Sequence, residues 1–181
     1  MGGEIKAEHP LIVFRYCPRC GHDGFVKRNA KAKSCPQCGF VYYANPSAAT
    51  ACFITDAGGR LLAVRRAHEP AKGTLDLPGG FMDMGETAEA GIIREVREET
   101  GMAVEEVTYL FSLPNLYPYG GMIVHTADLF FSARVADFAS AVADDDAAEL
   151  VPLAREEVHP EDFGLESVSR AVGLWLARTQ E

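Results

Sequence analysis

The chain has 181 residues and a formal net charge of −9, a length that suits one medium-sized domain and a small additional module. Hydrophobic residues make up 48% of the sequence, enough for a packed core, and no apolar run reaches the roughly 18 residues of a transmembrane helix. The N-terminus lacks the apolar centre of a signal peptide, so we expect a cytoplasmic protein without membrane contact.

The charge is unevenly distributed along the chain. Residues 1–45 hold seven Lys and Arg against three Asp and Glu, a net charge of +4, so the remainder carries −13. The acidic remainder argues against extended binding of duplex nucleic acid.

Four of the five cysteines form two knuckles, Cys17-Pro-Arg-Cys20-Gly21 and Cys35-Pro-Gln-Cys38-Gly39, separated by fourteen residues. Each knuckle can direct two thiolates at one point, and its glycine tolerates the positive φ that such a turn needs. Four converging thiolates predict a tetrahedral zinc site. Iron in a rubredoxin-like site is the alternative, although the short segment lacks the aromatic core that we expect for it. A disulfide pair is disfavoured because no secretion signal precedes it.

This zinc site is expected to be structural, because none of its four thiolates is spare and about forty residues could not fold alone. The basic stretch Lys27-Arg28-x-x-Lys31-x-Lys33 is interpreted either as a solvated hairpin or as a weak contact with a polyanion such as RNA. Pro46 marks the expected boundary, which divides the chain into a zinc ribbon at 1–45 and a second domain at 46–181.

After Pro46, apolar segments alternate with turns. Ala48–Thr55 predicts a buried strand with Cys52 as a core thiol, and Asp56–Gly59 predicts the hairpin turn to a returning strand at Arg60–Arg66. Thr74–Leu77 predicts a short strand that leads into a glycine-bounded segment. Further strands are expected at 104–111, 123–135 (with His125 packed inside it) and 149–153, and a closing amphipathic helix with Trp175 in the core at 165–177.

The glycine-bounded segment reads Gly80-x5-Glu86-x7-Arg94-Glu95-Val96-x-Glu98-Glu99-x-Gly101-Met102 and contains six carboxylates and two arginines. Thr87 is a suitable N-cap for a helix that runs to about Thr100, and Gly101 fits the C′ position. Ala88, Ile92 and Val96 then form one apolar face.

On this helix Glu95, Glu98 and Glu99 occur at i, i+3 and i+4, and Glu99 lies beside the apolar face. Carboxylates that converge near an apolar edge repel each other and lose water, so they need a positive partner. Arg94 could serve one of them, and a divalent hard cation could serve all three. A surface helix with ordinary i,i+4 ion pairs is the alternative interpretation.

The whole 23-residue pattern resembles the Nudix box without a mismatch. The resemblance implies a Nudix hydrolase, an α/β/α sandwich with a mixed sheet that cleaves a nucleoside diphosphate linked to another moiety. Glu95, Glu98 and Glu99 would bind Mg2+ or Mn2+, which an acidic body needs in order to bind an acidic diphosphate. The backbone carbonyl of Gly80 would be a further ligand.

Within the same resemblance, Glu86 would form hydrogen bonds in the site together with Arg94. Gly85 and Gly101 would have structural roles. Glu95, Glu98 and Glu149, an acid ahead of the last strand, are the candidates for the catalytic base, and Arg94 is counted with them as a catalytic residue. Glu149 is also a candidate for an added metal ligand.

The arrangement of a four-cysteine ribbon ahead of a Nudix box resembles that of the NADH pyrophosphatases. Their specificity motif begins eleven residues beyond the last glycine of the box, where this chain has Ser112. Pro114 and Pro118 match that motif in register and Tyr117 replaces a Phe, whereas the Gln and Trp of the motif are replaced. Two interpretations of this loop stay open: a specificity loop in which Tyr117 or Tyr119 stacks on a base, or a proline-rich loop that packs over the sheet.

The resemblance makes NADH, NAD and ADP-ribose-like compounds the expected substrates. Arg65 and Arg66, at the end of a strand, are either phosphate-binding residues or an ordinary surface pair. Two other functions stay open: removal of nucleotide caps from RNA, with the basic ribbon holding the RNA, and nucleotide sensing by a non-catalytic Nudix fold. A homodimer is suggested by analogy with relatives alone.

Overall fold

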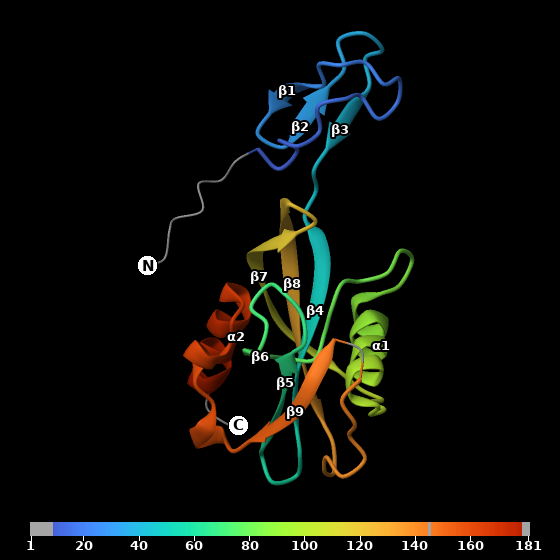
Figure 1. Ribbon diagram of the computed structural model, residues 1–181. Helices are drawn as coiled ribbons and strands as arrows, with labels where there is room; N and C mark the ends of the chain where they lie inside the picture. The colour runs from blue at the N-terminus through green and yellow to red at the C-terminus, as the bar shows by residue number, and fades with distance from the viewer. Residues whose placement is uncertain (1–8, 145, 179–181) are drawn as a thin grey trace. The chain divides into compact units, whose positions relative to one another are not determined.

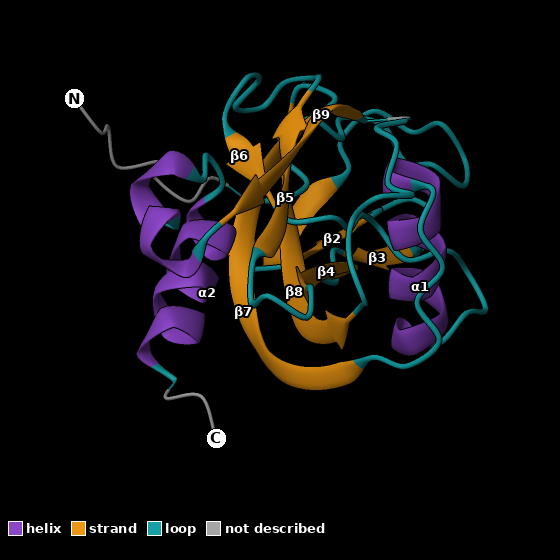
Figure 2. Cartoon of the chain, turned by 90° about the horizontal axis from the view of Figure 1, so that it is seen from below, coloured by secondary structure: helices purple, strands orange, loops and turns teal. Residues whose placement is uncertain are grey.

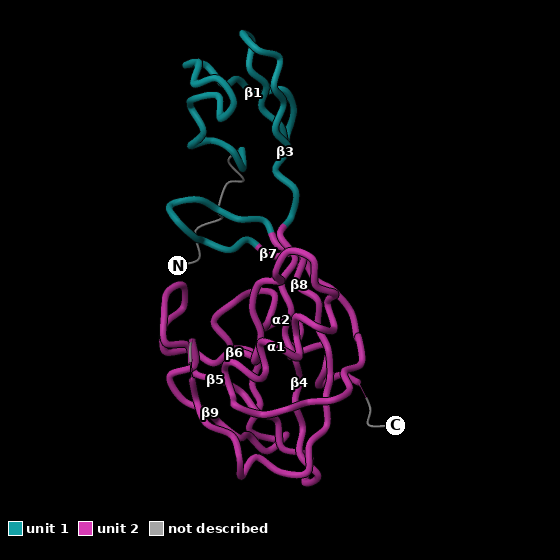
Figure 3. The backbone as a smooth tube through the Cα atoms, turned by 90° about the vertical axis from the view of Figure 1, so that its right-hand side faces the viewer, with its two compact units in different colours: residues 1–46, 116–125 teal, residues 47–115, 126–181 magenta. Residues whose placement is uncertain are grey.

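The structure is a computed structural model that describes residues 9–144 and 146–178. The chain forms two compact units, shown in different colours in Figure 3. The first unit consists of residues 1–46 and 116–125, and the second consists of residues 47–115 and 126–181. The expected ribbon thus shares its unit with the tip of a later hairpin, and the division into domains at 1–45 and 46–181 stays a prediction.

The first unit contains a three-stranded antiparallel sheet of β1 (Val26–Asn29), β2 (Ala32–Ser34) and β3 (Val41–Tyr43), with β2 in the centre. Its small core consists of Cys17, Phe25 and Cys35, with Cys38 and Phe40 packed against them. Because so few apolar residues are buried, we expect the fold of this unit to depend on a metal held by its cysteines.

The second unit is built on a six-stranded mixed sheet (Figure 1). In sheet order, its strands are β6 (Leu75–Asp76), β5 (Leu61–Arg66), β4 (Ser47–Thr55), β8 (Met122–Arg134) and β7 (Thr108–Tyr119), and β9 (Ala147–Leu153) pairs with β5. The pair β4–β8 is parallel, whereas β5 runs antiparallel to β4, β6 and β9. The expected hairpin at Asp56–Gly59 is confirmed, because Thr55 pairs with Leu61 across it.

Two helices cover opposite faces of this sheet, as Figure 2 shows. Helix α1 (Ala88–Thr100) packs on a core that includes Cys52 and Phe131, and helix α2 (Glu166–Ala177) packs on one that includes Phe53 and Phe130. Short 3-10 turns at Arg155–Glu157 and Pro160–Asp162 precede α2. The α/β/α sandwich with a mixed sheet is therefore confirmed.

Several side chains occupy the core positions that their sequence context predicts. Trp175 stacks on Phe53 with ring centroids 5.3 Å apart, so it is a core residue. Cys52 is fully buried, and burial raises the pKa of its thiol to about 12. His125 lies half-buried inside β8.

The region after the box differs from the prediction. The strand expected at 104–111 begins only at Thr108 and continues to Tyr119, so the proline-rich loop was the wrong expectation. Pro114 and Pro118 are tolerated because β7 is the last strand in the sheet order. Their spacing of four places both missing N–H groups on the same side of the strand, which can face away from β8.

Neither α1 nor α2 has the length and hydropathy that a helix needs to cross a membrane, and they are the α-helices of the described part of the chain.

Candidate active site and metal centres

The loop that opens the box is fixed to strand β4 by backbone hydrogen bonds. The N–H groups of Thr50 and Cys52 donate to the carbonyl oxygens of Gly80 and Pro78 at 2.8 and 2.9 Å. Gly79 lies so close to β4 that an added Cβ would sit 2.1 Å from the carbonyl oxygen of Thr50. Only glycine fits this position without moving backbone, and the loop is thereby held against the sheet.

Gly79→Ala is therefore expected to destabilise the protein by about 2 kcal/mol or more, because a strand or the loop must shift to make room. The matched control is Gly173→Ala in α2, where the added Cβ would meet only ordinary contacts, with Pro160 Cγ at 3.9 Å. That change is expected to be neutral or stabilising by about 0.5–1 kcal/mol. Urea unfolding measures both, and equal midpoints for the two variants would contradict the expected crowding.

Helix α1 has the ends that its sequence predicts. The side chain of Thr87 accepts a hydrogen bond from the N–H of Ala90, and Gly101 terminates the helix with φ 66°. Ile92 and Val96 are fully buried, which fixes the rotation of the helix about its axis. The box glutamates are thereby turned toward the loop at Gly80.

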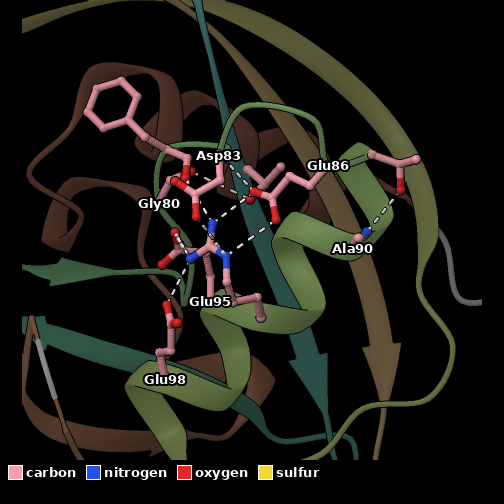
Figure 4. A network of polar contacts seen from close by, with 10 residues as sticks. Gly80, Asp83, Glu86, Ala90, Glu95 and Glu98 are labelled. Atoms are coloured by element: carbon pink, nitrogen blue, oxygen red, sulfur yellow. Dashed lines mark hydrogen bonds and ion pairs between the residues drawn. The ribbon is translucent and has the colours of Figure 1, made fainter.

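Arg94 forms the hydrogen bonds that join Glu86, Glu95 and Glu98, which are labelled in the polar network of Figure 4. Its guanidinium donates to Glu86 at 2.9 Å and to Glu95 and Glu98 at 2.8 Å each. It also donates to the carbonyl oxygen of Phe81 at 3.1 Å, which ties helix and loop together. The expected contact between Arg94 and Glu86 is present, and one cation is shared among four carboxylates, because Asp83 Oδ2 also lies 3.8 Å from Arg94 Nε.

The network shifts the ionisation of its members. The hydrogen bonds from Arg94 hold the pKa of Glu86 below its usual range, with help from the backbone N–H of Asp83. The pKa of Arg94 is raised in turn, chiefly by Glu86. A Cβ at Gly91 would lie 2.8 Å from Glu86 Oε1, so this helical glycine makes room for the carboxylate.

Glu99 lies apart from this network and is 6% exposed. Burial raises its pKa to about 8, and the carboxylates of Asp76, Glu95 and Asp146 add to that rise, while the N–H of Gly79, donating at 3.0 Å, opposes it. Within the described residues, no Lys, Arg or His forms an ion pair with Glu99. The prediction that Glu99 is withdrawn from water is confirmed.

The carboxylate oxygens of the box are the type of ligand that a hard divalent cation prefers. Glu95 lies against the loop, because a Cβ at Gly80 would meet its carboxyl group at 2.7 Å, and Glu99 accepts the N–H of the neighbouring Gly79 at 3.0 Å. The carbonyl of Gly80 accepts the N–H of Thr50 at 2.8 Å and the Thr50 hydroxyl at 3.5 Å, and the second, longer contact is the one that a cation would replace. In the described ranges, however, the four cysteines are the group of three or more such residues whose ligand atoms all lie within 4.8 Å of one another. Glu95 and Glu98 are instead joined through Arg94.

Two acidic residues near Glu99 were missed by sequence reasoning. Asp76 is buried on β6 and is held by Arg66, while Asp146 lies in the loop just ahead of β9. The backbone brings that loop to the helix end, because the N–H of Asp144 donates to the carbonyl of Glu99 at 3.1 Å. A strand pairing with β5 sets this position, so no local pattern could reveal it.

The remaining substrate and base candidates have partners of their own. Arg65 forms an ion pair with Glu149 at 2.8 Å, and Arg66 pairs with Asp76. Tyr117 and Tyr119 stack near the end of β7 with ring centroids 6.3 Å apart. These two tyrosines belong to the first compact unit and the box to the second, so their meeting at one substrate stays a prediction.

The four cysteines of the first unit form a metal-binding site. Cys17 and Cys38 are 3.7 Å apart between Sγ atoms, as are Cys20 and Cys35. That separation is close to the edge of a tetrahedron with metal–sulfur bonds of about 2.3 Å. Gly21 and Gly39 have φ values of 73° and 72°, as expected for the knuckles.

Backbone donors surround the thiolates. Although burial opposes it, the N–H groups of Cys20 and Arg19 lower the pKa of Cys17 to about 7. One expectation was wrong: the ribbon does have an aromatic core, since Phe25 and Phe40 stack at 6.2 Å. Because this core is present, the expected lack of one is no longer an argument against an iron site.

The chain belongs to the Nudix family, because the family model described as NUDIX domain matches residues 45–172. It is 32% identical over 124 residues to the NAD-capped RNA hydrolase NudC of Vibrio parahaemolyticus serotype O3:K6, a match that covers 68% of this chain and 47% of that protein. The chain thus spans about half the length of the curated relatives that it matches.

Solved structures agree on the fold. The crystal structure of a NUDIX hydrolase from Nitrosomonas europaea superposes with a TM-score of 0.69 at 21% identity and covers 90% of each chain. The NUDIX domain of Shewanella oneidensis NrtR, complexed with ADP ribose, gives a TM-score of 0.59 at 15% identity, covering 72% of this chain and 86% of that one.

Proposed function

We propose that this protein is a hydrolase that uses Mg2+ or Mn2+ to cleave the diphosphate of a nucleoside diphosphate linked to another moiety. The observation that carries the proposal is the complete Nudix box on α1, with its glutamates beside the Gly80 loop. NAD, NADH and ADP-ribose are the leading substrates. The named relatives point to NAD, and a structural neighbour is complexed with ADP ribose.

Glu95, Glu98 and Glu99 would hold the metal, with the Gly80 carbonyl as a further ligand. Bound there, the metal supplies charge neutralisation at the diphosphate and a lowered pKa for the attacking water. Arg94 positions Glu95 and Glu98 and connects them to the loop through Phe81. Glu86 in turn orients Arg94, and Gly85 and Gly101 shape the two ends of the helix.

The proton of the attacking water needs a carboxylate acceptor, for which Glu95, Glu98 and Glu149 are the candidates. We favour Glu98, because 45% of its side chain is exposed to water, compared with 13% for Glu95. Glu149 is more exposed, at 60%, and is paired with Arg65 as Glu98 is with Arg94, but it lies on β9 outside the box.

The test is hydrolysis of a panel of diphosphates by the purified protein with Mg2+ or Mn2+, with both products identified by mass. Glu98→Gln is expected to lower the rate at least about 100-fold. Glu89→Gln, an exposed glutamate on the same helix, is the matched control and should leave the rate unchanged. A protein that binds one ligand and turns over none would instead be a nucleotide sensor.

We propose zinc for the four-cysteine site, in a structural role, because all four thiolates are used in closing the tetrahedron. Elemental analysis of the purified protein distinguishes zinc from iron. The cytoplasmic location and the homodimer stay predictions.

The second candidate activity is removal of a nucleotide cap from RNA. The curated relatives are named NAD-capped RNA hydrolases, and the ribbon of this chain is basic. Rates on NAD and on an RNA carrying NAD at its 5′ end, compared at equal concentration, decide between the two substrates. A higher kcat/KM for the capped RNA would favour the second candidate.

A further inference from the structure

The first compact unit is strongly basic within its described residues, 9–46 and 116–125. Six Lys and Arg stand against one Asp, and that residue, Asp23, is already paired with Arg15 at 2.7 Å. Lys27, Arg28 and Lys31 are exposed and form no ion pair with any described residue. Their charge is therefore available to an external anion.

The strand register places basic and aromatic side chains on one face of the small sheet. Lys27 on β1 pairs with Lys33 on β2, which pairs with Tyr42 on β3. Residues directly opposite each other share a face, and the row spans two strand spacings, about 10 Å. Tyr43, the next residue along, points to the opposite face.

A second ring adjoins Tyr42 in this row. Phe14 meets Tyr42 edge to face with ring centroids 6.3 Å apart, and the two residues are 37% and 45% exposed. Lys33 Nζ donates to the carbonyl oxygen of Phe14 at 2.7 Å, which fixes the segment carrying that ring. Lys33 is itself 8% exposed, so Lys27 is the exposed cation of this row.

We propose that this face, formed by Phe14, Lys27, Lys33 and Tyr42 and called here the Tyr42 face, binds single-stranded nucleic acid. An exposed cation that contacts phosphate, here Lys27, next to rings on which bases stack, supplies the two elements of sequence-tolerant single-strand binding. A duplex keeps its bases stacked internally and cannot use the rings. An acidic peptide would use the cations but gain nothing from stacking.

The proposal is independent of hydrolysis and is tested without it. The probe is a fluorescently labelled single-stranded RNA of ten nucleotides with a 5′-hydroxyl end, which contains no diphosphate. Its anisotropy is measured with the full-length protein over a range of salt concentrations. Binding is expected to weaken as the salt concentration rises. Lys27→Ala is expected to reduce the slope of log binding constant against log salt concentration by roughly 0.7 in magnitude.

Tyr42→Leu is expected to weaken binding at least about fivefold, because one stacked base is lost. The matched control is Tyr43→Leu, on the same strand, similarly exposed at 42%, and on the opposite face; it should bind within twofold of the unchanged protein. The metal content of each variant reports whether the ribbon is intact. Lys27→Ala removes only an exposed side chain. Its effect on RNA binding therefore still tests the proposal if Tyr42→Leu loses its metal.

Three results would overturn the proposal. The first is an equal loss of affinity in Tyr42→Leu and Tyr43→Leu. The second is equal affinity for the single strand and for a blunt duplex of the same length. The third is equal competition by polyglutamate and by unlabelled RNA when the two are compared at the same concentration of negative charge. That result would identify a contact that recognises any polyanion.

Discussion

Glu99→Gln is expected to make the protein more stable at pH 8 in buffer without added divalent cation. The folded-state pKa of Glu99 is about 8, above its ordinary value of 4.5. Between these two values the folded protein binds more protons than the unfolded chain, so stability falls as pH rises. Over the whole pH range between the two pKa values, the free energy of unfolding falls by at most about 4–5 kcal/mol. Glutamine removes this loss, because it is neutral at every pH.

The measurement is urea unfolding at pH 5.5 and 8.5, with the metal of the cysteine site left in place. The unchanged protein should lose stability between these pH values, and Glu99→Gln should lose much less. Adding Mg2+ or Mn2+ at pH 8.5 should stabilise the unchanged protein and leave the variant almost unaffected, because a cation bound at Glu99 favours its charged form. Parallel pH profiles for the two proteins would show that Glu99 is not the titrating group.

Arg94→Met is expected to have the opposite effect and to destabilise the protein by about 2–3 kcal/mol. The change leaves the carboxylates of Glu86 and Glu95 without their cation, and their side chains are only 16% and 13% exposed. Glu98 is more exposed, and water screens much of its loss. The pKa of Glu86 should return toward its usual range.

Arg97→Met is the matched control, since Arg97 is an exposed arginine of the same helix that forms no ion pair within the described ranges. It should change stability by less than about 0.5 kcal/mol. Thermal unfolding at pH 7 compares the two variants. Mg2+ should restore part of the loss in Arg94→Met, because a divalent cation can neutralise the same carboxylates. Similar unfolding temperatures for the two variants would show that the network in Figure 4 contributes little.

Much of the candidate site could be predicted from local sequence. The cap at Thr87, the left-handed Gly101 and the apolar face of Ile92 and Val96 follow from helix geometry, and they place Glu99 beside the core. The cysteine knuckles could be predicted in the same way, because each depends on residues that are neighbours in the chain.

Local sequence therefore specifies the chemistry available to this protein: a glutamate-bearing helix, a glycine-bounded loop and four thiolates. Which charges meet depends on contacts between segments that are far apart in the chain. Pairing of β9 with β5 joins Glu149 to Arg65, and Asp146 acts on Glu99 from a loop more than forty residues away. The segment that was expected to be a loop forms strand β7, whose prolines are tolerated because the strand lies at the edge of the sheet. Such outcomes depend on strand order, which no local spacing encodes.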